Sequence, residues 1–132
     1  MTQEQKDLLL KDLCSRLPYG VKGVNKAGII TDPSDWYCGF VRLSKELENR
    51  ICYSDWRPYL FPLSSMTDEQ KKEWNKWKHL VPVCHYEYGD IVEEDELWDS
   101  PASFLYLIEN HFDCNDLIPL GLAVDATGKN IY

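Results

Sequence analysis

Two prolines, Pro58 and Pro62, place the strongest constraint on how this chain folds. Proline has no backbone N–H, so each one removes a hydrogen-bond donor from a β-ladder and is found at sheet edges rather than in central strands. The segment Trp56–Leu63 is therefore expected to be an edge strand or an extended crossing. Short β-rich pieces precede this segment and helical patterns follow it, so it separates two kinds of structure.

The first residues predict an amphipathic helix over about residues 3–16. Thr2 and Gln5 have the spacing of a capping box, in which each residue satisfies a backbone group of the other. Pro18 ends the helix because its ring moves the preceding residue out of the helical conformation. The leucines that recur at helical spacing predict a core-facing side: Leu9, Leu10, Leu13 and Leu17.

Four short segments between this helix and the first proline have the composition of β-strands. They are Val21–Val24, Ile29–Thr31, Tyr37–Leu43 and Arg50–Ser54, with Lys45–Asn49 as a charged connection before the last one. The connections are short, whereas parallel neighbours need a crossover of about a dozen residues or more. The four segments therefore predict a small antiparallel meander.

Two main helices are predicted in the second half of the chain. Thr67 and Gln70 repeat the capping-box spacing at the start of the first helix. Ser100 as N-cap and Pro101 at the first helical position begin the second, over Ala102–His111. Apolar residues surround much of this second helix, so it is expected to be largely buried.

The pieces between and after these helices are less regular. Val83–Tyr88 fits a strand, Asp90–Asp99 fits an acidic loop or a short helical turn, and Leu122–Asp125 fits a final strand. The predicted fold class is α+β: an N-terminal helix, a small antiparallel β meander, then two main helices and a short C-terminal strand. Residues 1–132 are expected to form a single globular domain, because 44% of them are apolar and the length suits one core.

The net charge of −8 is distributed unevenly along the chain. Residues 1–66 carry a net charge of +1 and residues 67–132 one of −9. Such an acidic surface repels phosphate backbones and anionic membranes, so no direct nucleic-acid binding by the acidic half and no membrane partner are expected. The densest acidic run contains no Lys or Arg and consists of Glu87, Asp90, Glu93, Glu94, Asp95, Glu96 and Asp99.

The cysteines and the apolar runs bear on the cellular compartment. Five cysteines stand at least fourteen positions apart and form no Cys-x-x-Cys pair, which favours buried, reduced thiols. No apolar run approaches the roughly 18–20 residues that cross a bilayer, and the first residues lack the pattern of a signal peptide. These features predict a cytoplasmic protein.

Three blocks of the sequence carry a resemblance to known sequences. They are Leu17-Pro18-Tyr19-Gly20-Val21-Lys22, then Pro58-Tyr59-Leu60 with Pro62-Leu63-Ser64-Ser65-Met66-Thr67, and His111-Phe112-Asp113 with Asp116-Leu117-Ile118 and Gly121-Leu122-Ala123. In these blocks the chain resembles small uncharacterised proteins of phages and mobile elements of gut bacteria. The resemblance implies no agreed activity. A basic residue commonly stands in that group at the place of Phe61, so no phosphate contact is implied at this position.

The best metal-ligating set consists of Cys84, His85, His111 and Cys114. Two Cys and two His ligands satisfy zinc by type. However, the neighbours Cys84 and His85 would point to opposite faces of a strand, so no metal and no cofactor are expected. The acidic run lacks the spacing of a calcium loop and is expected to be a solvated face.

No catalytic signature is present in the sequence. It lacks the glycine-rich phosphate loops, the Gly-x-Ser-x-Gly elbow and the His-Glu-x-x-His pair. An enzyme is therefore not the first expectation. The alternative hypothesis is a small hydrolase or transferase using Cys84, His85, His111 or Asp113, and it requires at least three of these groups to converge in one pocket.

Five residues are candidates for binding. Trp36, Trp56 and Tyr59 bracket the meander and have the amphipathic rings that suit binding surfaces, although core packing is the ordinary use of such rings. His111 and Asp113 directly follow a predicted helix, where polar residues either mark a site or cap the helix end.

The leading hypothesis is a small protein-interaction or ligand-binding module of phage or mobile-element origin, with a host protein or a small ligand as its partner. It would act through the aromatic residues or through the acidic segment Glu87–Asp99. A narrower hypothesis makes the acidic half a mimic of nucleic acid that occupies a DNA-binding protein. That version requires carboxylates spread across a surface at phosphate-like spacing.

Overall fold

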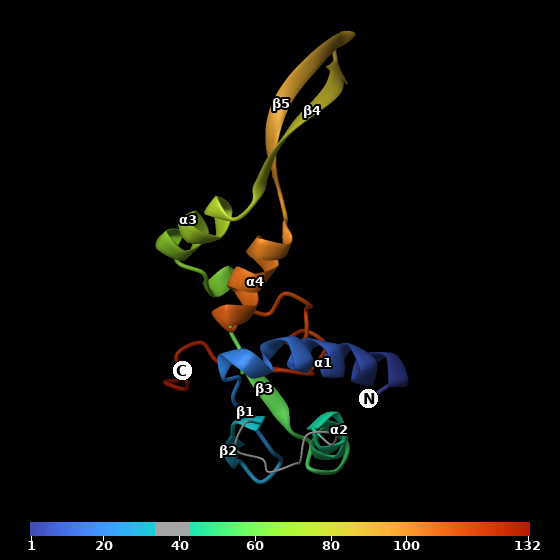
Figure 1. The fold of residues 1–132 in the computed structure, drawn as a ribbon, viewed down its shortest axis with the longest axis vertical. Helices are drawn as coiled ribbons and strands as arrows, with labels where there is room; N and C mark the ends of the chain where they lie inside the picture. Colours follow the sequence, from blue (N-terminus) through green and yellow to red (C-terminus); the bar gives the residue numbers. More distant parts are fainter. Residues whose placement is uncertain (34–42) are drawn as a thin grey trace.

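The computed structural model describes residues 1–33 and 43–132, and within these ranges the chain forms four α-helices and two small β-sheets. The chain is thus a mixed α and β protein (Figure 1). The α-helices and strands in chain order are α1 (Gln3–Arg16), β1 (Gly23–Val24), β2 (Ile30–Thr31), α2 (Leu43–Tyr53), β3 (Arg57–Leu60), α3 (Asp68–Lys76), β4 (His79–Glu87), β5 (Asp90–Trp98), α4 (Pro101–Glu109) and β6 (Val124–Asp125). Single 3-10 turns follow α1 and β3, at Leu17–Tyr19 and Leu63–Ser65.

Helix α1 has the predicted bounds and the predicted start. The Thr2 hydroxyl accepts from the Gln5 backbone N–H, and the Gln5 side chain accepts from the Thr2 N–H, which completes the capping box. Leu9 and Leu13 are fully buried on its inner face. The same face carries a buried ion pair between Arg16 and Asp12, one turn apart.

The larger sheet has the strand order β2-β1-β3-β6, so β3 is an interior strand. The prediction of an edge strand or crossing at the two prolines was therefore wrong for Arg57–Leu60, which contains Pro58. The Tyr59 N–H donates to the Lys22 carbonyl on the β1 side, so the nitrogen of Pro58 faces the β6 side. Pairing with β6 begins only at Tyr59. The missing N–H of Pro58 therefore costs no ladder bond.

Of the four segments of the predicted meander, the first two form β1 and β2 and pair antiparallel as expected. Strand β1 pairs antiparallel with β2 and with β3, but β6 pairs parallel with β3, in the register Tyr59 with Val124 and Leu60 with Asp125. The segment 61–123 supplies the crossover that a parallel pair needs. The last strand is therefore confirmed near Leu122–Asp125, but its direction could be known only once its partner was known.

Helix α2 replaces two predicted features, the charged connection Lys45–Asn49 and the strand Arg50–Ser54. Leu47 and Ile51, four residues apart, are buried in the core on one face of α2. Glu46 and Arg50 form an ion pair across one turn of the helix. The β-rich composition around Ile51 was misleading because burial of a helical stripe outweighs weak strand propensity. The predicted strand Tyr37–Leu43 lies outside the described residues except for Leu43, which begins α2.

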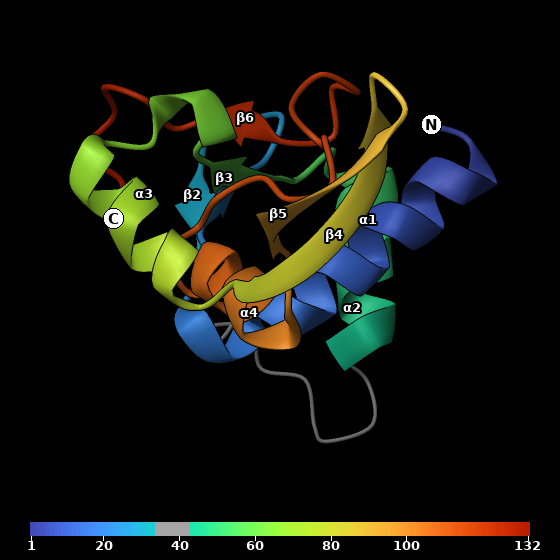
Figure 2. The same cartoon turned by 90° about the horizontal axis from the view of Figure 1, so that it is seen from above.

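The main core lies between the sheet and the helices α1 and α2, which pack side by side (Figure 2). Trp56 occupies its centre with 1% of its surface exposed, and its indole N–H donates to the Thr31 hydroxyl at 3.2 Å. A second, smaller cluster of Met66, Leu107 and Phe112 lies under α3 and α4. The described residues thus form two apolar clusters, and α1 lies between the sheet and α4 (Figure 1).

Helices α3 and α4 begin as predicted, but α4 is not largely buried. Thr67 with Gln70 and Ser100 with Ser103 form capping boxes at the two starts. Only Ser103 and Leu107 of α4 are buried, whereas Phe104 and Leu105 are 45% and 41% exposed. The chain before α4 forms a hairpin that leads away from the rest of the described fold, which is called the body below (residues 1–33, 43–78 and 99–132). The outer side of α4 therefore stays exposed, because no described element covers it.

Gly23 permits the closest approach in the core, because a Cβ at this position would overlap the ring of Trp56 and the carbonyl oxygen of Arg57. We expect Gly23→Ala to lower the free energy of unfolding by about 1–3 kcal/mol, as overpacking does. Urea denaturation would measure the loss. The same substitution in a Trp56→Phe background should cost less, because phenylalanine lacks the overlapping part of the indole. An equal cost in both backgrounds would contradict this packing account.

Candidate functional site

A long β-hairpin, β4–β5, is the feature that most distinguishes this molecule. Nine residue pairs run from His79 opposite Trp98 to Glu87 opposite Asp90. Tyr88 and Gly89 close it with φ of 52° and 84°, and positive φ at both central residues is typical of the type I′ turn that suits twisted hairpins. The hairpin projects well beyond the body (Figure 1).

The root of the hairpin is fastened to the helices on either side. The Ser100 hydroxyl, which caps α4, donates to the carbonyl of Trp77 at the end of α3. Lys78 and Asp99 approach to 3.9 Å across the root, and the Lys78 ammonium lies 3.6 Å from the centre of the Trp74 ring. These contacts hold both ends of the hairpin on the body while its length extends into solvent.

The hairpin is exposed on both faces. Within its two strands, which are described throughout, no residue is buried. Opposed residues share a face, so Leu80 with Leu97 and Tyr86 with Ile91 lie on one side of the ribbon. Their side chains are 63%, 48%, 79% and 68% exposed, respectively. A solvated two-stranded ribbon is at best marginally stable in water, so such exposure points to an interaction surface.

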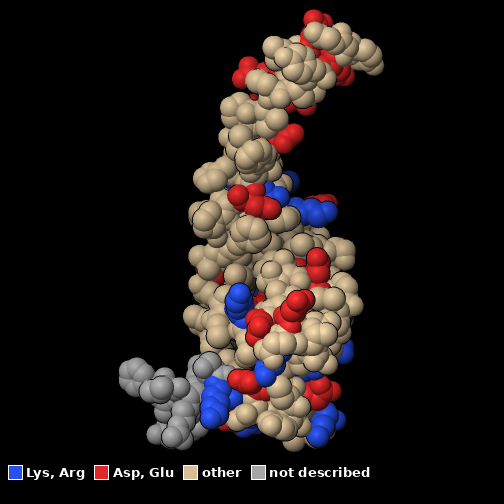
Figure 3. Space-filling model, turned by 90° about the vertical axis from the view of Figure 1, so that its right-hand side faces the viewer, with Lys and Arg blue, Asp and Glu red and all other residues tan. Residues whose placement is uncertain are grey.

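The hairpin is also strongly acidic. Figure 3 shows the carboxylates spread along its length. Glu94 and Glu96 lie on one face, and Glu93 and Asp95 lie on the other. No Lys or Arg stands between His79 and Trp98 in the sequence. The ribbon therefore combines apolar side chains with an uncompensated negative charge.

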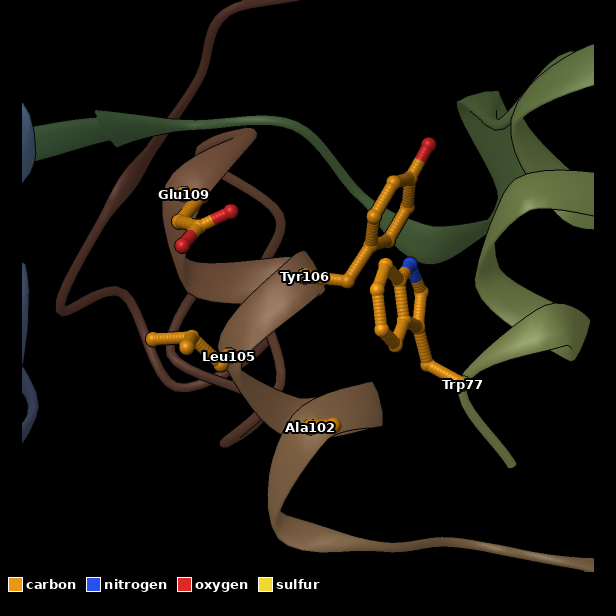
Figure 4. Close-up of a pocket in the computed structure, with 5 residues that line it drawn as sticks. All are labelled: Trp77, Ala102, Leu105, Tyr106 and Glu109. Carbon is orange, nitrogen blue, oxygen red and sulfur yellow. The ribbon is translucent and has the colours of Figure 1, made fainter. Parts of the chain in front are cut away.

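A shallow apolar hollow of about 140 Å³ lies next to the root, between the end of α3 and one side of α4 (Figure 4). Trp77, Leu105 and Tyr106 supply most of its walls, and in Figure 4 the Trp77 indole lies beside the Tyr106 ring. Trp77 is 52% exposed. The hollow thus adds a second exposed apolar area next to the root of the hairpin.

His111 lies on the body, in a polar cluster with Tyr132. The two rings stack with their centres 3.6 Å apart. The Tyr132 hydroxyl donates to the Tyr59 carbonyl at 2.8 Å, and burial raises its pKa to about 12. Burial also lowers the pKa of His111 to about 4, with further contributions from the charges of Arg16 and Lys22. His111 is therefore neutral at pH 7 and stacks on Tyr132, whose own hydroxyl holds it to the sheet.

Asp113 caps the turn that follows it. Its two carboxylate oxygens accept from the backbone N–H groups of Leu117 and Ile118, each at 2.9 Å, and the residue is buried. Both acceptor atoms are thus used by the backbone. The capping alternative for Asp113 is the one the geometry supports.

The predicted aromatic surface is not present at the residues that the structure describes. Trp56 and Tyr59 are 1% and 7% exposed and belong to the interior of the body. The two prolines do hold this segment extended, but both of its rings are buried, and Trp56 belongs to the main core cluster. Trp36 lies outside the described residues.

The structure does not bring the predicted metal-ligating residues together. Cys84 and His85 lie on the exposed hairpin, where they point to opposite faces, and His111 and Cys114 lie on the body. No group of three or more His, Cys, Asp or Glu residues within the described ranges is arranged to hold a metal ion. The same separation removes the convergence that the hydrolase or transferase alternative requires.

The cysteines that the structure describes are not buried as predicted, and Cys38 lies outside the described residues. Cys14, Cys52 and Cys84 are exposed and Cys114 is half-buried, and these four are unpaired thiols. The first two lie on the outer sides of α1 and α2, where helical spacing rather than residue type decides exposure. Burial raises the pKa of the Cys114 thiol, which opposes its use as a nucleophile.

Sequence reasoning missed the hairpin because its second strand is rich in Glu and Asp, which have low strand propensity. The signal that could have found it is the Tyr88-Gly89 pair between two segments that contain β-branched residues, including Val81, Val83 and Val92. The alternation of polar and apolar residues is weak because neither face is covered. A ribbon exposed on both faces therefore shows no regular two-residue alternation from which a strand could be predicted.

Comparisons with known proteins do not place the chain in a family: no family model, curated protein or solved structure matches it. Among the described residues, no helix has both the length and the apolar character needed to cross a membrane.

The lowered pKa of His111 predicts a specific pH dependence of stability. The unfolded chain binds a proton near pH 6.5 and the folded chain only near pH 4, so the folded state loses stability as the pH falls through this window. We expect His111→Phe, which keeps the ring stack but cannot titrate, to lose less stability between pH 6.5 and 4. Denaturation at several pH values would measure it, and parallel curves for the two proteins would refute the assignment.

Proposed function

We propose that this chain is a protein-interaction module that binds its partner through the β4–β5 hairpin. The observation that carries the proposal is a ribbon of nine residue pairs with no buried residue, fastened at its root to the body. A two-stranded hairpin without other contacts is at best marginally stable in water, so an ordered ladder of this length is best explained by a partner that covers it. The apolar side chains along one face supply the contact area that protein interfaces use.

A protein partner fits the surface better than a small ligand does. Three hollows bordered by described residues measure about 140–250 Å³, below the roughly 300–1,000 Å³ of typical ligand pockets. The hairpin instead offers an extended and accessible surface. Its charge selects a partner with a basic surface and disfavours nucleic acid itself.

The nucleic-acid mimic is the less favoured form of this proposal. The carboxylates Glu93, Glu94, Asp95 and Glu96 alternate between the two faces of a narrow ribbon. Neither face therefore carries the broad array that a DNA-binding groove contacts. The phage or mobile-element origin and the cytoplasmic location stay predictions.

Shortening the hairpin tests the proposal. Replacing residues 80–97 by Asn-Gly joins His79 to Trp98 through the favoured two-residue turn, and it preserves the Ser100 contact at the root. We expect the body to keep a cooperative thermal transition, since its core is unchanged. Partners captured from a bacterial lysate by the full chain should be lost, whereas Lys26→Gln, on a distant exposed turn, should keep them. Capture of the same proteins by the shortened chain would contradict the proposal.

A further inference from the structure

The register of the hairpin determines which backbone groups point outward. Opposed residues in an antiparallel ladder alternate between hydrogen-bonded and non-hydrogen-bonded pairs. The pair Glu87–Asp90 closes the two-residue turn, and such a turn closes on a hydrogen-bonded pair. Counting from that pair, Pro82–Asp95 is non-hydrogen-bonded, which agrees with the absence of an N–H in proline. Backbone groups in the non-hydrogen-bonded pairs face away from the ladder.

The two edges of the hairpin are therefore unequal. On the β4 edge, Pro82 interrupts the outward row of donors at the second of its four positions. The β5 edge carries a complete row, with the N–H and C=O groups of Ile91, Glu93, Asp95 and Leu97 all directed outward. The sheet has two strands, and the described residues add no third strand to either edge. The β5 edge is thus an open template for strand addition.

The side chains of β5 indicate which kind of partner strand would fit beside its edge. Four central acids, Glu93 to Glu96, are flanked by Ile91 and Val92 on one side and by Leu97 and Trp98 on the other. The complementary strand has central Lys or Arg residues flanked by apolar residues, and the near-symmetry of the pattern allows either direction. A second copy is disfavoured, because pairing two β5 edges would place like charges opposite each other.

We propose that the β5 edge binds an extended basic segment of a partner protein by β-strand addition. The inference rests on the proposed function of the hairpin and narrows it to one edge and one partner chemistry. Backbone hydrogen bonds from the outward row supply the affinity, and the acids select basic side chains over others. The exposed pair Leu80–Leu97 lies where the flanking apolar residues of the partner would reach the face of the ribbon.

A capped peptide with four central lysines and two valines at each end serves as the probe. Titration followed by amide NMR should show binding by the wild-type protein that weakens as salt is raised. The outward amides of Ile91, Glu93, Asp95 and Leu97 should gain protection from hydrogen exchange. The same peptide N-methylated at all four lysines keeps its charge but lacks the central backbone donors on both of its edges, so it should bind poorly.

The matched protein variants are Glu93→Pro and Glu93→Ala. Both remove the same charge, but only the proline removes an outward N–H while leaving the inner ladder in place. Cross-strand contacts between Tyr86 and Ile91 in the NMR spectrum verify that the hairpin persists. We expect the proline variant to bind the peptide about tenfold more weakly than the alanine variant, the effect of a lost and obstructed hydrogen bond.

Three results would overturn the inference: equal binding by the two Glu93 variants, no peptide binding by the wild-type protein at low salt, or a β5-mediated dimer of the free protein that Glu93→Pro dissolves. The partners captured from lysate show whether only the β5-edge inference fails or whether the proposed function of the hairpin fails as well. If they require the hairpin but tolerate Glu93→Pro, the edge assignment is wrong and the hairpin proposal stands. If they also bind the shortened chain, the hairpin proposal itself fails.

Discussion

The body of this protein depends on the buried ion pair between Arg16 and Asp12. Both side chains are fully removed from solvent at the end of α1. The same guanidinium donates to the Phe112 carbonyl at 2.7 Å, and the Asn115 amide donates to Asp12 at 2.8 Å. Two buried charges are tolerated only when they are paired and hydrogen-bonded. The pair therefore requires α1 and the segment after α4 to meet in one arrangement, and so joins the first residues of the chain to the last third.

This arrangement divides the molecule into a packed body and an unpacked arm. Trp56, Leu60 and the inner faces of α1 and α2 fill the body, and His111 stacks on Tyr132 at its margin. The hairpin shares none of this packing except at its root, where Ser100 and Lys78 make their contacts. Its two strands are stabilised mainly by each other. A segment with so little burial is suited to contact a partner, because its apolar side chains and one backbone edge are already accessible.

The elements with strong local signals were predicted well. The capping residues Thr2, Thr67 and Ser100 each begin a helix in the structure, because a cap acts on its own first turn and needs no distant partner. The elements that depend on distant partners were predicted poorly. Helix α2 forms because Leu47 and Ile51 meet the core, and Asp90–Trp98 is a strand because β4 lies opposite it. Local propensity is too weak to decide such cases.

The candidate site was anticipated only in part. The acidic segment Glu87–Asp99 is a site candidate by its charge alone, and its ordered, two-stranded form was not predicted. The rings of Trp56 and Tyr59 suit a binding surface by type, but both are buried, and the burial of Trp56 depends on its packing against residues of α1, α2 and the segment 117–123. Asp113 turned out to serve the backbone beside it. Residue type alone does not distinguish a ring or carboxylate that meets solvent from one that meets the chain.

The sequence by itself determined the helix starts, the extended form of the segment at the two prolines and the concentration of negative charge in the second half. These follow from local sterics, from short-range hydrogen bonds and from composition. Only the tertiary structure decided that Pro58 lies in an interior strand, that Trp56 is buried and that the acids line the open edge of a projecting hairpin. Those features depend on which distant segments pair, and pairing is set by the packing of the whole chain.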